Sequence, residues 1–297
     1  MIYSLVFLNV IITAFQGITT KYFSENYPGK KENSSTVFSV LIGILVTLGV
    51  IASGIIRPEG FTLTVTLLGA LRSLTVIAYT FCLMTASAKG PYSLLTIFSM
   101  CGSIIIPLFV DLAFGKHIEA FKYAAMVTMI VSFFLICRPS SDEEKVKKGF
   151  YPACIGIFIA NGLYGALTPL ATYLEGDDMG HEIIVTTYVS SAVISLLILA
   201  FREKAKVATT FKLNKRSILF AVITAAIIAS TSILGIITLT GFGNIKGIDG
   251  ALNMTLLCGG VLISSELLSK FMLKEKFTAV KWGGIALATA SIVVLTL

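Results

Sequence analysis

Residues Thr36–Ile56 read TVFSVLIGILVTLGVIASGII, a run without a charged side chain. An α-helix that crosses the hydrocarbon core of a bilayer needs about 20 mainly apolar residues, and this run meets that length. It is followed by Arg57-Pro58-Glu59-Gly60, which combines charges with a helix breaker and a flexible residue. This stretch therefore predicts a transmembrane helix and its end.

Nine other stretches have the same character. The apolar N-terminus has no basic segment before it, so we interpret it as the first span rather than a cleaved signal peptide. We expect ten spans, at Tyr3–Tyr22, Thr36–Ile56, Phe61–Ser87, Tyr92–Phe114, Phe121–Cys137, Tyr151–Leu174, Ile183–Phe201, Ser217–Thr240, Gly250–Phe271 and Thr278–Leu297. The predicted fold class is an all-α polytopic membrane protein.

Composition agrees with a membrane protein. Of 297 residues, 56% are hydrophobic and 13% are charged, with a mean hydropathy of +0.90. Soluble domains carry roughly 25% charged residues. The loops between ten spans are too short for a soluble domain, which excludes a membrane-anchored enzyme domain, a nucleotide-binding domain and an extracellular receptor domain.

The net charge of +7 indicates contact with anionic lipid rather than nucleic acid, because basic loops are typical of membrane proteins. We expect no cofactor, no metal and no catalytic group. The two histidines, His117 and His181, are solitary and lack metal-ligand spacing. The cysteines lie in apolar stretches without a C-x-x-C pair and are interpreted as packing residues: Cys82, Cys101, Cys137, Cys154 and Cys258.

The chain divides into two similar halves. We expect a first five-helix repeat at 1–140, a polar linker at 141–149 and a second repeat at 150–297. Phe61–Cys137 aligns without a gap on Phe220–Thr296, with matching spans and loops and nine identities. Because five is odd, the second half enters the membrane from the opposite side. Inverted repeats are common in secondary transporters, which bind substrate near the bilayer midplane.

The C-terminal stretch carries a more specific pattern. Leu273-Lys274-Glu275-Lys276-Phe277-Thr278, followed by Lys281-Trp282-Gly283-Gly284-Ile285-Ala286, resembles the end of an EamA-like repeat of the drug/metabolite transporter superfamily. The counterpart in the first half, Phe114-Gly115-Lys116-His117-Ile118, departs from the pattern, since Lys116 stands where the family usually has Glu. The first span has Phe15-Gln16-Gly17 in place of the family's Trp-Gly. The resemblance implies a ten-helix carrier of small organic solutes that does not hydrolyse ATP.

Arg72 lies near the middle of its predicted span, Phe61–Ser87, too deep to reach the membrane surface easily. A central Arg or Asp costs about 2.5–3.5 kcal/mol on insertion scales. Two interpretations stay open. Arg72 faces a water-filled cavity, where it meets an anionic substrate group or a carboxylate, or it forms an interhelical ion pair that fixes packing.

Glu266 is the acidic candidate for proton coupling, because a partly desolvated Glu can hold a proton near neutral pH. A pair with Lys270, one turn later, is an equal alternative. We predict that five polar residues join Arg72 in binding substrate: Gln16, Tyr79, Asn161, Tyr164 and Asn253. For each of them an interhelical hydrogen bond is the alternative.

Other acidic residues are given structural interpretations. Asp111 is expected at the membrane interface. Glu175, Asp177, Asp178 and Glu182 crowd one short loop and are interpreted as a solvated turn.

We therefore predict a secondary-active carrier of a small organic solute, with protons as the candidate coupling ion, working as a monomer in a prokaryotic plasma membrane. The alternatives are an efflux pump for cationic amphiphilic drugs or, in a different class, an intramembrane enzyme or a scaffold. The sequence gives an enzyme no support, because it has neither an H-E-x-x-H motif nor a Ser/His pair at membrane depth.

The charges also predict an orientation. Of the 23 Lys and Arg residues, 18 lie on the side reached by loops after odd-numbered spans and 4 on the other side, with Arg72 between them. The positive-inside rule then places both termini outside the cytoplasm. Members of the superfamily usually have both termini inside, so the two expectations disagree.

Overall fold

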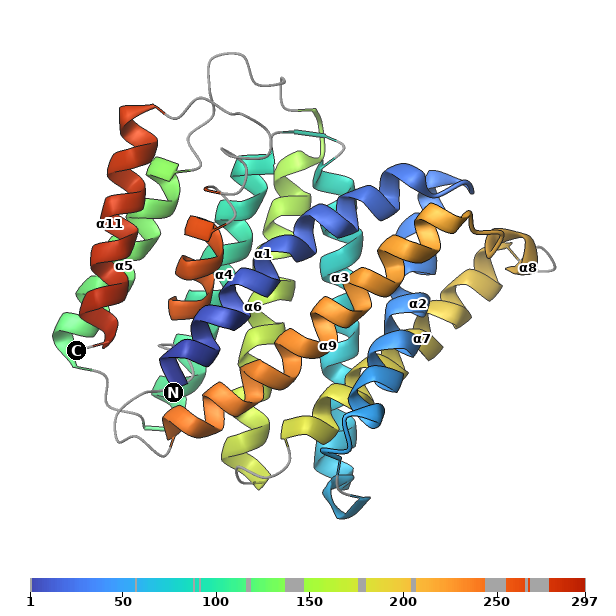
Figure 1. Cartoon of the computed structure of the whole chain (residues 1–297), viewed down its shortest axis with the longest axis horizontal. Helices are drawn as coiled ribbons and strands as arrows, with labels where there is room; N and C mark the ends of the chain where they lie inside the picture. The colour runs from blue at the N-terminus through green and yellow to red at the C-terminus, as the bar shows by residue number, and fades with distance from the viewer. Residues whose placement is uncertain are drawn as a thin grey trace. The chain divides into compact units, whose positions relative to one another are not determined.

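The computed structural model describes residues 2–56, 58–87, 89–90, 92–115, 119–136, 147–175, 180–203, 207–243, 255–264, 267 and 278–296. Within these ranges the secondary structure is helical. The longer helices are α1 (Ile2–Asn26), α2 (Lys31–Ala52), α3 (Leu63–Ser87), α4 (Tyr92–Ala113), α5 (Ala120–Ile136), α6 (Phe150–Glu175), α7 (Gly180–Glu203), α9 (Lys215–Gly243) and α11 (Ala279–Thr296) (Figure 1). Shorter helical pieces are η1 (Pro58–Gly60), α8 (Val207–Thr210) and a helix at Thr255–Ser264.

Most of these boundaries lie within a few residues of the predicted spans. Among the nine longer helices, the largest difference is at α2, which begins at Lys31 rather than Thr36. Asn33, Ser34 and Ser35 are polar but buried, so they extend the helix without adding to its hydropathy. The helix ends at Ala52, where Gly54 takes a positive φ of 70° that glycine adopts without strain.

Three helices begin at a capping side chain. Asn214 Oδ1 accepts a hydrogen bond from Ser217 N–H at 2.7 Å, directly before α9. Thr62 Oγ1 does the same for Val65 N–H before α3, and Thr278 Oγ1 for Lys281 N–H before α11. Such caps satisfy one of the four backbone donors that a helix start leaves without a partner. Thr278, the hydroxyl residue of the C-terminal pattern, is therefore the N-cap of α11.

Five helical stretches in the described residues are long and apolar enough to cross a membrane: Lys31–Ala52, Leu63–Ala86, Phe150–Leu167, His181–Glu203 and Lys215–Thr238. Five shorter apolar helices run over Ser4–Gln16, Ile97–Ala113, Ala120–Ile136, Thr255–Ser264 and Ala279–Leu295. All ten overlap the predicted spans. Helical secondary structure with several membrane-length apolar helices is thus confirmed for the described residues.

The chain folds into two compact units, and each unit takes segments from both halves of the sequence. Unit 1 comprises Met1–Ala14, Cys82–Pro169 and Ile237–Leu297, and unit 2 comprises Phe15–Phe81 and Leu170–Ile236. The two segments of unit 2 have equal length, so their residues can be paired from first to last by adding one constant number. The division at 141–149 concerns repeats rather than compact units, and it stays a prediction.

Unit 2 is built around the pair α2 and α7, which lie side by side (Figure 1). The helices run antiparallel, because Lys30 and Asn33 at the start of α2 bond to Glu203 at the end of α7, at 3.3 Å and 2.8 Å. They approach each other closely at Gly43, where an added Cβ would lie 2.6 Å from the carbonyl oxygen of Tyr188.

Unit 1 contains the matching pair α5 and α11 (Figure 1). These helices are also antiparallel, since Gly284 near the start of α11 lies against Ile136 at the end of α5. They share an apolar core with α4 and the Thr255–Ser264 helix, whose fully buried side chains include Met129, Phe133 and Ile136.

Candidate functional site

Helix α3 has two chemically different faces. Leu63, Leu67, Leu71 and Leu74 are 50–75% exposed, and their spacing of three and four residues places them on one stripe of the helix. Arg72 is 5% exposed and lies on the opposite side of the helix. The leucines form the face suited to lipid, and the guanidinium is held inside the protein.

The position of Arg72 is set by a close crossing of α3 and α7. A Cβ at Gly69 would collide with the side chain of Thr186. On the same side, Val65 packs against Ile183 in a small buried cluster. Arg72 lies about one turn beyond this crossing, so the absence of a side chain at Gly69 allows α7 to approach the helix that carries the charge.

Helix α7 contributes a row of hydroxyl groups to the interior of unit 2. Thr187, Ser191 and Ser195 follow one another at four-residue spacing and are 0–1% exposed. Thr187 Oγ1 donates to the backbone carbonyl of Ile183 at 2.6 Å. Ser195 Oγ has no hydrogen-bond partner within the described part of the chain. Buried hydroxyls are normally satisfied, so the Ser195 hydroxyl is a donor and acceptor that is still available for a hydrogen bond within the described part of the chain.

Guanidinium and hydroxyl groups can both bind an anion. Arg stays protonated at any accessible pH and presents a planar fork of donors that fits carboxylate and phosphate oxygens. Hydroxyls add donors or acceptors as the bound group requires. The interior of unit 2 thus combines residue types that recognise an anionic or zwitterionic solute.

Two other predicted site residues also belong to unit 2. Tyr79 lies two turns after Arg72 on α3, on nearly the same face, and is partly buried. Gln16 lies in α1 and is partly buried as well. Its backbone carbonyl accepts hydrogen bonds from the hydroxyls of Thr19 and Thr20, at 3.0 Å and 2.8 Å.

Asn161 and Tyr164 lie in α6, within unit 1. The amide nitrogen of Asn161 donates to Ser99 Oγ at 2.8 Å and to Ser103 Oγ at 2.6 Å, both on α4. The helices approach closely here, because an added Cβ at Gly162 would lie 2.6 Å from the carbonyl oxygen of Gly102. Asn161 therefore makes the interhelical hydrogen bonds that its alternative interpretation expects. Its contact with substrate stays a prediction.

Two of the predicted site residues, Asn253 and Glu266, lie outside the described residues. Their roles in substrate binding and proton coupling stay predictions. In the ranges that the structure covers, no group of three or more His, Cys, Asp or Glu residues is placed to hold a metal ion.

The interpretation of Glu182 as part of a solvated turn is wrong. Its side chain is 1% exposed and packs against Gly60, where an added Cβ would lie 2.7 Å from the Glu182 carboxyl carbon. Asp111 in α4 is also fully buried. One signal for Glu182 was available in the sequence. The residue directly precedes the apolar run Ile183-Ile184-Val185 and belongs to the first turn of that helix.

Comparison with known proteins gives a fold. Twenty-eight chains in solved structures match this chain. One of them is a chain from a crystal structure and is 13% identical in sequence. The superposition covers 100% of this chain and 98% of the other chain, with a TM-score of 0.72. The two chains share a fold. No protein-family model and no curated protein matches the sequence.

Proposed function

We propose that this protein is a secondary-active carrier that moves a small organic metabolite across the membrane by alternating access. The observation that carries the proposal is Arg72, a permanent charge that is 5% exposed inside an apolar, membrane-length helix. Ionisable residues inside membrane helices are costly and mark substrate or ion pathways. The hydroxyls of Thr187, Ser191 and Ser195 in the same unit support a polar interior.

The proposed architecture is ten membrane spans in two inverted five-helix repeats. Its support comes from the two antiparallel pairs. In the predicted repeat, α2 corresponds to α7 and α5 to α11, and in each case the corresponding helices are the ones that pack together. An in-plane two-fold axis would produce this arrangement, because it reverses the direction of a helix relative to the membrane. The equal lengths of the two segments of unit 2 also support a repeat.

In the proposed mechanism Arg72 orients the carboxylate or phosphate of the substrate. Glu266 carries the coupled proton, and the resemblance to the EamA-like carriers agrees with a solute carrier that uses no ATP. Transport requires the site to open to one side of the membrane at a time, through rocking of repeat-related elements around the site. The protein supplies binding and orientation, and no covalent step is involved.

The test is solute flux into liposomes that contain the purified full-length protein. Labelled amino acids, carboxylic acids and phosphorylated metabolites are offered with and without an inward proton gradient, beside ethidium as a cationic amphiphile. The proposal expects saturable uptake of an anionic or zwitterionic solute above that of protein-free liposomes. Flux of ethidium alone would assign the protein to drug efflux, and no flux with any solute would contradict a carrier.

A further inference from the structure

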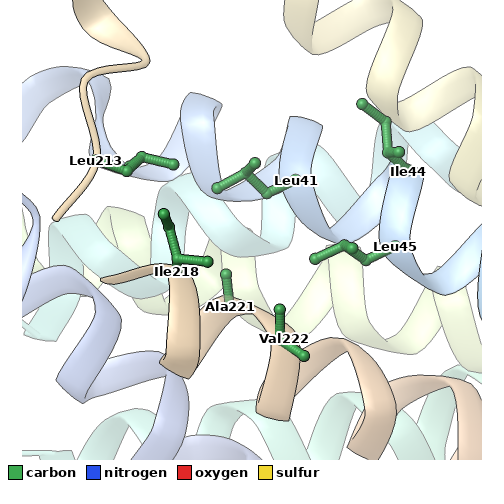
Figure 2. Close-up of a pocket in the computed structure, with 7 residues that line it drawn as sticks. All are labelled: Leu41, Ile44, Leu45, Leu213, Ile218, Ala221 and Val222. Carbon is green, nitrogen blue, oxygen red and sulfur yellow. The ribbon is translucent and has the colours of Figure 1, made fainter. Parts of the chain in front are cut away.

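A groove on unit 2 is lined by apolar side chains alone. It has a volume of about 290 Å³ and lies between α2 and α9, with the loop before α9 at one end (Figure 2). Its lining residues are Leu41, Ile44, Leu45, Leu213, Ile218, Ala221 and Val222. This groove is separate from the row of hydroxyls on α7 and has no role in the proposed transport.

The groove has a structural cause. Helices α2 and α9 meet at Gly49, where an added Cβ would lie 3.4 Å from the Cβ of Ala229. Nearer the start of α9 the facing side chains are larger, namely Ile218 and Val222 against Leu41 and Leu45 (Figure 2). The two helices are close together at Gly49 and Ala229 and are held further apart where the larger side chains face each other. The space between them is therefore wedge-shaped.

The groove opens on a face suited to lipid and lies near one end of α9. Ile44, Ile218 and Val222 line it and are 45–48% exposed. Ile218 and Val222 are three and seven residues beyond Lys215, which begins α9, or roughly 5 and 10 Å along the helix axis. Such a depth matches the hydrocarbon directly beneath the headgroups.

Positive charge gathers next to the groove. Lys212, Lys215 and Arg216 are exposed and alternate along the chain with the lining residues Leu213 and Ile218. Between residues 202 and 216 the sequence has six Lys or Arg and one acidic residue, Glu203. Glu203 is bonded to Lys30 and Asn33 at the start of α2. The helix that follows also has no acidic residue in its first turn.

We infer that this groove binds an anionic phospholipid, with an acyl chain between α2 and α9 and the headgroup phosphate at Lys212, Lys215 and Arg216. The chemistry of the two parts matches the two parts of a lipid. A hydrocarbon chain suits a lining without polar atoms, and basic clusters beside membrane helices bind anionic headgroups. The charge distribution places this loop on the basic side of the protein, and the positive-inside rule predicts that this side faces the anionic cytoplasmic leaflet.

The test uses a tryptophan at the edge of the groove. The chain has a single tryptophan, Trp282, which lies in α11. Leu213→Trp in a Trp282→Phe background therefore reports from the loop alone. The protein is reconstituted in phosphatidylcholine vesicles, and its fluorescence is quenched by brominated phosphatidylglycerol or brominated phosphatidylcholine at equal mole fraction.

We expect phosphatidylglycerol to bind next to the reporter at least about fivefold more tightly than phosphatidylcholine, since each Lys or Arg near the surface contributes on the order of that factor. Lys212→Gln/Lys215→Gln/Arg216→Gln should reduce the ratio to near one. Lys147→Gln/Lys148→Gln, which changes two exposed lysines of unit 1, should leave it unchanged.

The apolar part is tested separately. Val222→Phe fills the groove and should lower quenching by both lipids. The matched control is Val193→Phe, because Val193 is 51% exposed on α7 and lies outside the groove lining. A lipid ratio near one in the parent protein, or one that survives the triple charge change, would overturn the proposal. So would a dimer in detergent that Val222→Phe dissociates, because the groove would then bind a second copy. None of these results depends on transport.

Discussion

The pairs α2/α7 and α5/α11 are built alike but differ in what they bury. Both are antiparallel, and both approach closely at one glycine, Gly43 or Gly284. The α5/α11 pair buries two serines, and each bonds to its own helix: Ser132 Oγ to the Met129 carbonyl at 2.6 Å and Ser291 Oγ to the Leu287 carbonyl at 3.0 Å.

In the α2/α7 pair the hydroxyls of Ser34 and Ser195 are buried without a hydrogen-bond partner among the described residues. A buried donor without a partner costs about 1–3 kcal/mol, and the cost is removed when water or a solute enters. The two pairs thus differ in whether their buried serine hydroxyls are satisfied within the described residues, and under the proposed function the hydroxyls of α2/α7 are the ones that a solute would meet.

The largest loss of stability is expected at the close glycine contact that the two helix pairs share. Gly43→Leu and Gly284→Leu should each cost about 3 kcal/mol or more, because a side chain would meet the backbone of the facing helix. Gly283→Leu is the control, since nothing lies within 4 Å of an added Cβ there. Thermal unfolding in detergent measures all three. Tolerance of either clashing variant would show that the pair is not closely packed.

A smaller loss is expected from the apolar core of unit 1. Met129→Ala should lower the free energy of unfolding by about 2 kcal/mol, the low end for such truncations. The loss is small because lipid is about as apolar as the protein core, so only packing contacts are lost. Val127→Ala, on the exposed face of the same helix, should change stability by less than about 0.5 kcal/mol. Equal losses at the two positions would refute a tightly packed α5/α11 core.

At the polar end of unit 2, Tyr27→Phe should cost about 1 kcal/mol. Tyr27 OH donates to the Thr210 carbonyl at 2.9 Å, and both residues are buried. Burial raises the pKa of Tyr27, and the negative charge of Glu203 raises that pKa further. A raised pKa means that the folded chain holds this proton more tightly. The contribution of the protonated Tyr27 to the free energy of unfolding is therefore fully present below pH of about 10 and is lost as the pH rises through the folded-state pKa.

Unfolding by denaturant at pH 8 and at pH 10.5 measures the effect of Tyr27→Phe. A difference between wild type and variant that grows with pH would contradict the assigned sign.

The smallest effect on stability is expected at the serines. Ser195→Ala should leave stability unchanged or raise it by up to about 1 kcal/mol, because it removes a buried hydroxyl without a partner among the described residues. Transport should fall if this hydroxyl meets the solute. Ser132→Ala removes a hydroxyl that is already satisfied and should leave transport unchanged. Equal transport by the two variants would remove the distinction between the pairs.

Much of the helical pattern follows from the sequence because apolar length decides it. The predicted ends Tyr92 and Ser87 match α4 and α3. Hydropathy failed where polar residues are buried, as at Asn33 in α2 and Glu182 in α7, because a hydropathy average treats every polar side chain as solvated. The short helix α8 was also missed, since four residues give no periodic signal.

The candidate site was predicted in part. The depth of Arg72 in its predicted span indicated a buried charge, since a residue at that depth is far from the membrane surface, and Arg72 is buried in the structure. Its role in binding stays a prediction. The hydroxyls of Thr187, Ser191 and Ser195 gave no comparable signal, because serine and threonine are frequent in membrane helices and bond to their own backbone. What distinguishes them is their burial and, for Ser195, a hydroxyl without a hydrogen-bond partner among the described residues, and composition contains neither property.

The most direct test of the account is transport by Arg72 variants in liposomes, with thermal stability measured on the same preparations. We predict that Arg72→Gln abolishes uptake and stays folded, and that Arg72→Lys keeps the charge but binds carboxylate or phosphate poorly without the planar fork. A stable Arg72→Gln that transports at the wild-type rate would contradict the account. So would a loss of about 3–5 kcal/mol that Arg72→Gln/Glu266→Gln restores, because Arg72 would then be one member of a structural ion pair.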